Sequence, residues 1–231
     1  MMIGISQPTF MPWIGYFAFL DKIDKLIFLD DVQFDKRSWQ QRNYIKLNKE
    51  KSLLTISVKS KGKFDQKISD VEIIYDKNLD LIKKKIFFAY NKAKYYKNYN
   101  NEIFDILDKK YTYLSELNIE LIKHFTRILN LNTDFDYSSN YSLNFKKENL
   151  IFELCKKNNC KEYLSTLGSK QYLESLNTIP ETNIKILYFD YKDTIYNQLS
   201  GNFISKLSIL DLLFNEGSNS INIIRQGFRI I

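Results

Sequence analysis

Short, bounded runs of apolar residues mark the first third of the chain and recur once near its end. Runs of this length, rich in isoleucine and leucine, are typical of β-strands. From residue 53 to residue 58 polar and apolar side chains alternate, which predicts a strand with one buried face. Strands are predicted at residues 3–6, 25–29, 44–47, 53–58, 71–74 and 184–189.

Longer segments place apolar residues three and four positions apart, which is the spacing of an amphipathic helix. Gly217 follows the last of these segments, where a glycine commonly ends a helix. Residues 130–144 are polar and are expected to contain little structure. Helices are predicted at residues 80–96, 112–131, 147–157 and 208–215, and a short amphipathic one after Gly15 and Tyr16.

Strands therefore dominate the first third, helices the middle, and a mixed unit ends the chain. This order predicts an α/β protein with a small parallel or mixed sheet, a Rossmann-like opening, and a largely helical middle and C-terminal part. We expect residues 1–76 and 160–231 to form one α/β unit and residues 77–159 a mainly helical subdomain. A single domain would also be compatible with this length.

Composition limits the class of protein. No run of 18 apolar residues exists, so no membrane span is expected, and the N-terminus lacks a secretory signal, so we expect a cytoplasmic protein. The net charge is +7, but lysine supplies 29 of the 34 basic residues and arginine five, as in the product of an AT-rich genome. The charge is therefore weak evidence for nucleic-acid binding. Arg37 and Arg42 are more informative, because guanidinium groups suit bidentate recognition of phosphate.

Cysteine and histidine are scarce. Cys155 and Cys160 are interpreted as two reduced thiols, since one C-x4-C pair does not supply a zinc site. The single histidine, His124, is expected to be a satisfied residue of a long helix, and mechanisms that need a histidine base are disfavoured. No residue is assigned as a metal ligand on this evidence.

The loop after the first predicted strand is the densest candidate site. Two prolines fix its path, a glycine allows close backbone approach, and aromatic rings offer stacking surfaces. A ligand loop is the favoured interpretation, and a tight turn with an aromatic plug is the alternative. The candidate binding residues are Gln7, Phe10, Trp13, Gly15 and Tyr16.

A second group follows the second predicted strand. Asp30 and Asp31 are the candidate catalytic residues, because paired carboxylates serve as acid and base or hold Mg²⁺. The arginines would bind an anionic substrate. A solvated strand end with surface ion pairs is the alternative. The candidate binding residues here are Gln33, Arg37, Arg42 and Asn43.

Two further candidates lie near the C-terminus. Ser165, Gly168 and Lys170 precede a predicted helix and have the residue types of a phosphate-binding loop, although a plain helix cap explains them equally well. Asp211 lies in an apolar helix and is a candidate binding residue. The alternatives are a place on the polar flank of that helix or a structural hydrogen bond.

Two resemblances extend this picture. The first loop resembles that of nucleotidyltransferases of the HIGH superfamily, but residues 13–16 read WIGY and lack both histidines of the HxGH motif. The whole set of segments resembles the WbqC-like protein family. The residues that carry this resemblance are QPTFMPWIGYF at 7–17, LDDVQF at 29–34, Arg42-Asn43, Tyr163-Leu164-Ser165, Gly168, Lys170, Tyr172-Leu173, SILDLLFN at 208–215 and Gly217.

The resemblance implies a cytoplasmic role in making surface-glycan precursors. We expect a transferase that adds an acyl or aminoacyl group to a nucleotide-activated sugar, with aminoacyl-tRNA or an acyl carrier as donor. A ligase variant would use ATP and Mg²⁺. The alternatives are a non-enzymatic module that binds nucleotide sugars or docks with another glycan enzyme, and RNA binding through residues 92–97, although a solvated helix face explains those residues better. The sequence does not indicate an oligomeric state.

Overall fold

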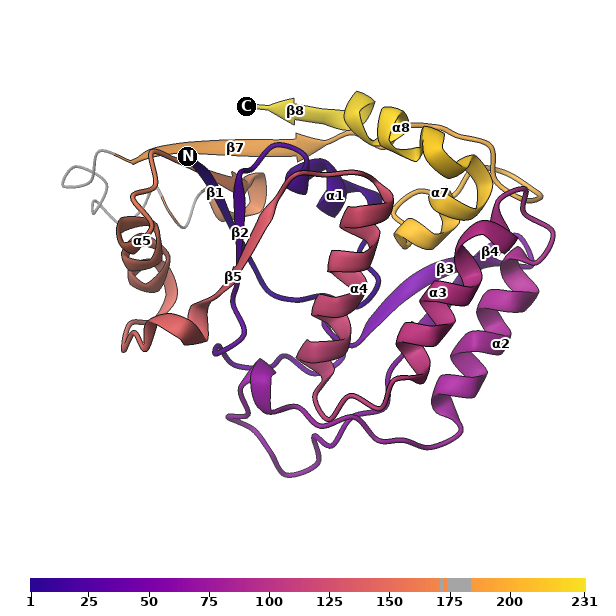
Figure 1. Cartoon of the computed structure of the whole chain (residues 1–231), viewed down its shortest axis with the longest axis horizontal. Coiled ribbons are helices and arrows are strands. Elements are labelled where there is room, and N and C mark those ends of the chain that lie inside the picture. Colours follow the sequence, from indigo (N-terminus) through magenta and orange to yellow (C-terminus); the bar gives the residue numbers. More distant parts are fainter. Residues whose placement is uncertain (171–172, 174–183) are drawn as a thin grey trace.

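The centre of the molecule is a six-stranded sheet with the order β5-β2-β1-β6-β7-β8 (Figure 1). The computed structural model describes residues 1–170, 173 and 184–231. All neighbouring strands run parallel except β7 and β8, which run antiparallel. The α/β class with a mostly parallel sheet is thus confirmed. The strands are β1 (Met2–Ser6), β2 (Lys25–Phe28), β5 (Asp134–Tyr137), β6 (Glu162–Thr166), β7 (Lys185–Tyr191) and β8 (Phe228–Ile230).

The strand order is that of a doubly wound fold. Taken in chain order, the six strands occupy the positions 3-2-1-4-5-6 across the sheet. The chain moves outward from β1 through β2 to β5, and then returns to place β6 on the other side of β1. The connections that leave β1 and β6 therefore diverge, and a crevice opens outside their carboxyl ends.

Helices cover both faces of this sheet, and Figure 1 shows α5 (Lys147–Lys157) on one side and α1 (Ile14–Leu20) with α4 (Leu114–Ile128) on the other. A two-stranded antiparallel hairpin and further helices extend the second side. No helix in the described part is both long and apolar enough to cross a bilayer. The remaining elements are β3 (Arg42–Leu47), β4 (Glu50–Thr55), α2 (Asn78–Tyr90), α3 (Tyr96–Asp108), α7 (Ile209–Glu216) and α8 (Ser220–Gly227).

Alternation along β1 divides the core into two layers. Ile3 and Ile5 pack in the cluster that includes Leu154 of α5. Gly4 faces the other way, where the side chains of Phe19 and Ile23 come close to its Cα. The larger core cluster on that side joins α1 and α4 to the hairpin and to α7. The opening strand and α1 are thus buried against both the sheet and the helical part of the chain.

Several predicted elements differ from the structure for identifiable reasons. Helix α1 is not amphipathic, because all seven of its residues are buried between the sheet and the second layer. The helix predicted at 80–96 ends at Tyr90, and α3 is a separate element. Residues 71–74 form only isolated bridges. A helix was also predicted after Lys170. Tyr172 and most of that segment lie among residues 171–172 and 174–183, which are outside the described residues.

Three strands were not predicted where they occur, and the shortest of them is β8 at the edge of the sheet. β5 lies in the segment 130–144 that was expected to contain little structure, and β6 lies in the segment interpreted as a phosphate loop. β5 also pairs with β2, although it falls inside the range 77–159 assigned to a helical subdomain. The proposed division into two units stays a prediction.

We predict that Gly4→Ala lowers the free energy of unfolding by about 1 to 3 kcal/mol, as overpacking of a core does. The new Cβ would lie 2.2 Å from a ring carbon of Phe19, and that ring is stacked on Phe189 and has little room to move. Chemical denaturation measures the effect. Gly168→Ala is the control, since a Cβ there meets no atom within 4 Å. Equal stability of the two variants would contradict this packing.

Candidate functional site

A cavity of about 500 Å³ opens outside the carboxyl ends of β1 and β6, at the point where the strand order reverses. We call it the switch-point cavity. The loop after β1 and the start of α1 form one wall, and the end of β6 forms the other. Its polar and aromatic lining includes Gln7, Thr9, Trp13, Tyr16, Ser165 and Ser169.

The side chain of Gln7 is fixed by a hydrogen bond to Gln40. The Gln40 side chain donates a hydrogen bond of 2.8 Å to Oε1 of Gln7. Asn118 of α4 donates to the backbone oxygens of Pro8 (3.1 Å) and Gln40 (2.7 Å). These bonds tie the loop after β1 to the loop before β3. Among the described residues no hydrogen bond uses Nε2 of Gln7. The amide therefore presents a fixed donor at the cavity.

Gly15 is needed for the position of Trp13. A Cβ at Gly15 would lie 2.4 Å from the Trp13 ring, so only glycine lets the indole fold onto the start of α1. Trp13 also packs edge-to-face on Tyr191, with ring centroids 5.4 Å apart. This contact joins the β1–α1 loop to the end of β7. The indole thus forms a rigid wall of the cavity.

Tyr16 contributes a buried hydroxyl. Its oxygen makes no hydrogen bond of normal geometry within the described part, although the Ser6 hydroxyl lies near it. Burial raises the pKa of Tyr16, and the interaction with Ser6 offsets only part of this rise. The hydroxyl therefore stays protonated at neutral pH and can donate. A buried, unpaired donor is costly unless a ligand or water satisfies it.

The opposite wall carries hydroxyl groups. Ser165 lies at the end of β6, and its oxygen is 2.7 Å from that of Ser169 and 3.3 Å from that of Tyr163. No carboxylate, histidine, cysteine, lysine or arginine is among the described residues that line the cavity. Its described lining is therefore uncharged, with amide and hydroxyl groups set among apolar and aromatic side chains, which suits neutral ligand groups better than ionised ones.

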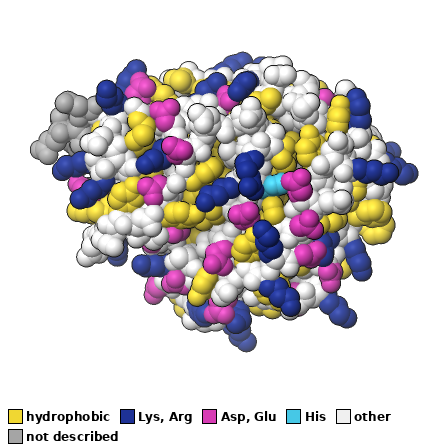
Figure 2. Space-filling view, in the orientation of Figure 1, with side chains coloured by type: hydrophobic (Ala, Val, Ile, Leu, Met, Phe, Trp, Pro, Cys, Tyr) yellow, Lys and Arg dark blue, Asp and Glu magenta, His cyan; other side chains and the backbone are white. Residues whose placement is uncertain are grey.

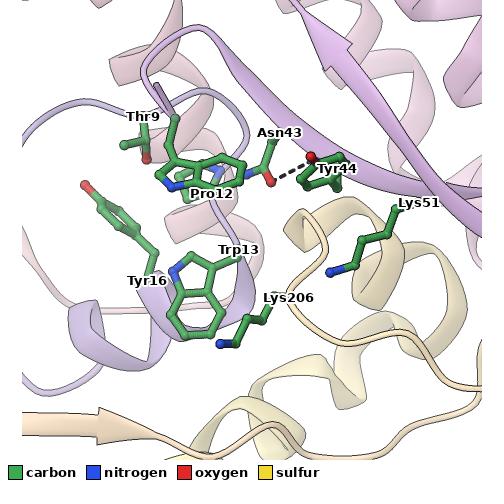
Figure 3. A pocket seen from close by; sticks show the side chains of 9 residues that line it. Thr9, Pro12, Trp13, Tyr16, Asn43, Tyr44, Lys51 and Lys206 are labelled. Carbon is green, nitrogen blue, oxygen red and sulfur yellow. Dashed lines mark hydrogen bonds between the residues drawn. The ribbon is translucent and has the colours of Figure 1, made fainter. Parts of the chain in front are cut away.

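A second hollow of about 420 Å³ adjoins the first, and Thr9, Trp13 and Tyr16 line both. We call it the lysine hollow. Asn43 lies in its wall, where its side chain donates to the backbone oxygen of Met11 (2.8 Å) and accepts from the backbone N–H of Tyr44 (2.8 Å). Figure 3 shows these side chains and the hydrogen bond between Asn43 and Tyr44. The other lining residues are Pro12, Trp39, Lys51 and Lys206.

The paired carboxylates do not face the switch-point cavity. Asp30 is 8% exposed, and both of its carboxylate oxygens accept hydrogen bonds from Ser138 and Ser139 at 2.7 to 3.0 Å. Ser138 also donates to Asp31. This cluster ties the end of β2 to the turn after β5. Asp30 therefore acts here as a structural acceptor, and its catalytic role stays a prediction.

Asp31 and Gln33 line a separate hollow of about 580 Å³. Gln33 is exposed and donates to the backbone oxygen of Phe64 at 2.9 Å. No residue is common to this hollow and the switch-point cavity. The second group of candidates is therefore divided between two places. In the described residues no three His, Cys, Asp or Glu side chains gather as a metal site would require.

Other candidates also lie away from the cavity. Phe10 is fully buried in the larger core cluster, so it offers no stacking surface. Arg37 is exposed, and Arg42 pairs with Thr55 in the hairpin; neither lines the switch-point cavity or the lysine hollow. Gly168 is exposed with open space around it, and the Lys170 ammonium lies over the Tyr188 ring at 5.6 Å.

Asp211 is 1% exposed and belongs to a buried network rather than to a cavity wall. Its carboxylate accepts hydrogen bonds from the hydroxyls of Tyr90 (2.9 Å) and Tyr196 (2.8 Å). Burial raises the pKa of Asp211, and the two hydrogen bonds oppose this rise without cancelling it. The network joins α2, α7 and the segment before α7. Asp211 thus makes the structural hydrogen bond that was the alternative interpretation.

Sequence reasoning missed four residues of the lysine hollow: Trp39, Tyr44, Lys51 and Lys206. They come from residues 39–51 and from the segment around Lys206, which are far apart in the sequence, so no local spacing could connect all four. One signal was present, because Trp39 is one of only two tryptophans in the chain and lies in a polar stretch. At 54% exposure it is a large aromatic surface open to solvent.

One family model and one curated relative match nearly the whole chain. The sequence model described as the WbqC-like protein family matches residues 7–223. An uncharacterized protein of Mycobacterium tuberculosis, Rv1507c, is 32% identical over 225 residues, which cover 96% of this chain and 97% of that protein. No solved structure matches the chain significantly.

We predict that Asp30→Asn lowers the free energy of unfolding by about 1 to 2 kcal/mol, because it weakens charge-assisted hydrogen bonds from Ser138 and Ser139. Ligand affinity should stay within twofold of the wild type. Asp35→Asn, at an exposed carboxylate, is the matched control for denaturation. Unchanged stability with lost activity would return Asp30 to a catalytic role.

Asp211 gives a prediction about pH. Its pKa in the folded protein is raised above its ordinary value of 3.8. Between these two values the folded state binds more protons than the unfolded state, so stability falls as the pH rises. The stability of the wild type minus that of Asp211→Asn should therefore decrease as the pH increases from 3.8 through the raised pKa. Denaturation at several pH values measures this difference, and a rising or flat difference would refute the assignment.

Proposed function

This chain belongs to the WbqC-like protein family, and from that premise we propose that it binds a nucleotide-activated sugar and transfers an acyl or aminoacyl group to it. The reaction would supply a modified precursor for a surface glycan. Nucleotide-activated sugars and aminoacyl-tRNA are made in the cytoplasm, so the proposal includes a cytoplasmic place of action. The switch-point cavity is the proposed place of the sugar.

The observation that carries this proposal is an uncharged, hydroxyl-rich cavity at the switch point of a doubly wound sheet. Ligands of such sheets bind outside the carboxyl ends of the strands at this point. Sugar hydroxyls need several fixed donors and acceptors, and Gln7, Ser165 and Ser169 provide them on two facing walls. The Trp13 ring provides a flat apolar surface of the kind on which a sugar ring packs.

The lining also limits the chemistry. A sugar amine or hydroxyl would attack the carbonyl carbon of the activated donor, form the new C–N or C–O bond and expel the donor's leaving group. The nucleophile's proton would pass to that group or to solvent. No ionised side chain is among the described residues that line the cavity, so the rate enhancement would come from positioning and from hydrogen bonds to the developing oxyanion. Tyr16 and Gln7 are the proposed donors.

The donor is the open part of this proposal. Aminoacyl-tRNA and an acyl carrier both deliver an activated acyl group, and a variant would activate a carboxylic acid with ATP and Mg²⁺. On the face shown in Figure 2 basic and acidic side chains are interspersed, so the net charge of +7 does not form one patch there. A dependence of product formation on tRNA, carrier or ATP separates these donors.

A second candidate function is a non-enzymatic module that binds the nucleotide sugar or docks with another glycan enzyme. The uncharged lining favours it, because the described residues around the cavity include no conventional acid or base. Both candidates require the same binding site. Product formation is the measurement that distinguishes them.

We predict that a nucleotide sugar raises the melting temperature of the wild type, and that Gln7→Ala and Trp13→Ala each weaken its binding at least tenfold, about 1.4 kcal/mol. A panel of UDP, GDP and dTDP sugars with calorimetric titration provides the measurement. Lys61→Ala, in an exposed turn that lines neither the cavity nor the lysine hollow, is the control.

The same panel, incubated with aminoacyl-tRNA, acyl carrier or ATP with amino acids, is then analysed by mass spectrometry. A product lost in both cavity variants supports the transferase. Binding without product in any mixture favours the module. Absence of binding to every sugar, or full affinity in both variants, would overturn the proposed site.

A further inference from the structure

We infer that the lysine hollow binds the nucleoside diphosphate part of the ligand, with the diphosphate on Lys51 and Lys206 and the base against the exposed ring of Trp39. This inference rests on the proposed function and deepens it, because it divides one ligand between two adjoining hollows. The sugar occupies the uncharged switch-point cavity. The charged and aromatic part occupies the neighbouring one.

Charge is the first argument. A diphosphate carries at least two negative charges, and no cation lines the switch-point cavity among the described residues. The lysine hollow holds two exposed lysines and no carboxylate in its described lining. No ion pair joins Lys51 or Lys206 to an acidic residue in the described part, so their charges are available to a ligand. Figure 3 shows both ammonium groups on the side of the hollow below Tyr44.

Aromatic surface is the second argument. Trp13, Trp39 and Tyr44 all line the hollow, and Trp39 packs edge-to-face on Tyr44 with centroids 5.9 Å apart. That contact leaves Trp39 54% exposed. An exposed indole beside cationic side chains is the usual surface for a nucleic-acid base, because stacking and phosphate contacts act together. The Lys51 ammonium lies 5.6 Å from the centre of the Tyr44 ring, which keeps it in the hollow.

The hollow is also a built feature rather than a gap between loose loops. The backbone N–H of Ser208 donates to Tyr44 (2.8 Å) and that of Ile209 donates to Pro12 (2.8 Å), so the segment that carries Lys206 is fastened to the hairpin and to the β1–α1 loop. Phe10 donates to the backbone oxygen of Trp39 at 2.9 Å. Three segments from distant parts of the chain are therefore held in a fixed relation.

The lysine hollow differs from a second basic hollow because it is continuous with the switch-point cavity. Thr9, Trp13 and Tyr16 line both the lysine hollow and the cavity, so one ligand can span them. The other basic hollow lies beside Lys46, Lys49 and Lys92 and shares no residue with the cavity. Its Lys46 ammonium is already held by Gln198 and by the backbone oxygen of Asn202.

The experiment uses the two tryptophans of the chain, since Trp13 and Trp39 both line the lysine hollow. Intrinsic tryptophan emission is titrated with UDP, GDP, dTDP, inorganic pyrophosphate and the nucleotide sugar that binds. We expect at least one nucleoside diphosphate to quench the emission. The double variant Lys51→Gln/Lys206→Gln should weaken its binding tenfold or more and reduce the dependence of affinity on salt.

The matched control is Lys61→Gln/Lys84→Gln, which removes two exposed lysines elsewhere and should keep wild-type affinity within twofold. Lys51→Arg/Lys206→Arg keeps both charges and should restore most of the affinity, which separates charge from folding. Trp39→Phe should keep binding but lose much of the quenching.

Two negative results have different meanings. If the wild type binds a nucleotide sugar and the glutamine variant binds it equally well, the lysine hollow is not the diphosphate site, and the proposed function survives. If the wild type binds neither nucleotide sugars nor nucleoside diphosphates, the proposed function fails and this inference fails with it. Binding of a nucleoside diphosphate but of no nucleotide sugar would support the hollow and contradict the proposed substrate.

Discussion

The structure depends on the parallel pairing of β1 with β2 on one side and with β6 on the other. This pairing sends the connections after β1 and β6 in different directions, and the opening between them becomes the cavity. Gly4 allows α1 to pack closely on β1, and Gly15 allows Trp13 to fold over the start of α1. The site therefore follows from how the first strand is covered, and its residues are placed by backbone constraints before any ligand arrives.

Two of the charged candidates, Asp30 and Asp211, have structural tasks. Asp30 accepts hydrogen bonds from the turn after β5, and Asp211 accepts them from two tyrosine hydroxyls. Buried carboxylates need such partners, because an unsatisfied charge in the interior is costly. The groups left at the cavity are amides, hydroxyls and aromatic rings. Among the described residues, the carboxylates of Asp30 and Asp211 thus hold the fold, neutral groups line the switch-point cavity, and two exposed lysines line the adjoining hollow.

Local patterns predicted local features well. The strand before Gln7, the strand before Asp30 and the helix at 147–157 follow from apolar runs, and the crowded loop from Gln7 to Tyr16 does line a cavity. The class of sheet was also predictable. β6 was missed because its residues 163–166 resemble a loop rich in hydroxyls, and β5 because an edge strand needs few apolar residues.

Placement across the chain could not be predicted from spacing. Arg42 and Asp31 are close in sequence, yet Arg42 pairs with Thr55 in the hairpin and does not line the hollow that Asp31 lines. Lys206 reaches the lysine hollow from the far end of the chain. Such neighbours are set by sheet order and by loop hydrogen bonds. A crystal structure of the complex with the nucleotide sugar tests the central claim most directly. The account predicts sugar density between the ends of β1 and β6, in contact with Gln7 and Ser165. Sugar density beside Asp31 and Gln33, or beside Arg37 or Arg42, would contradict it.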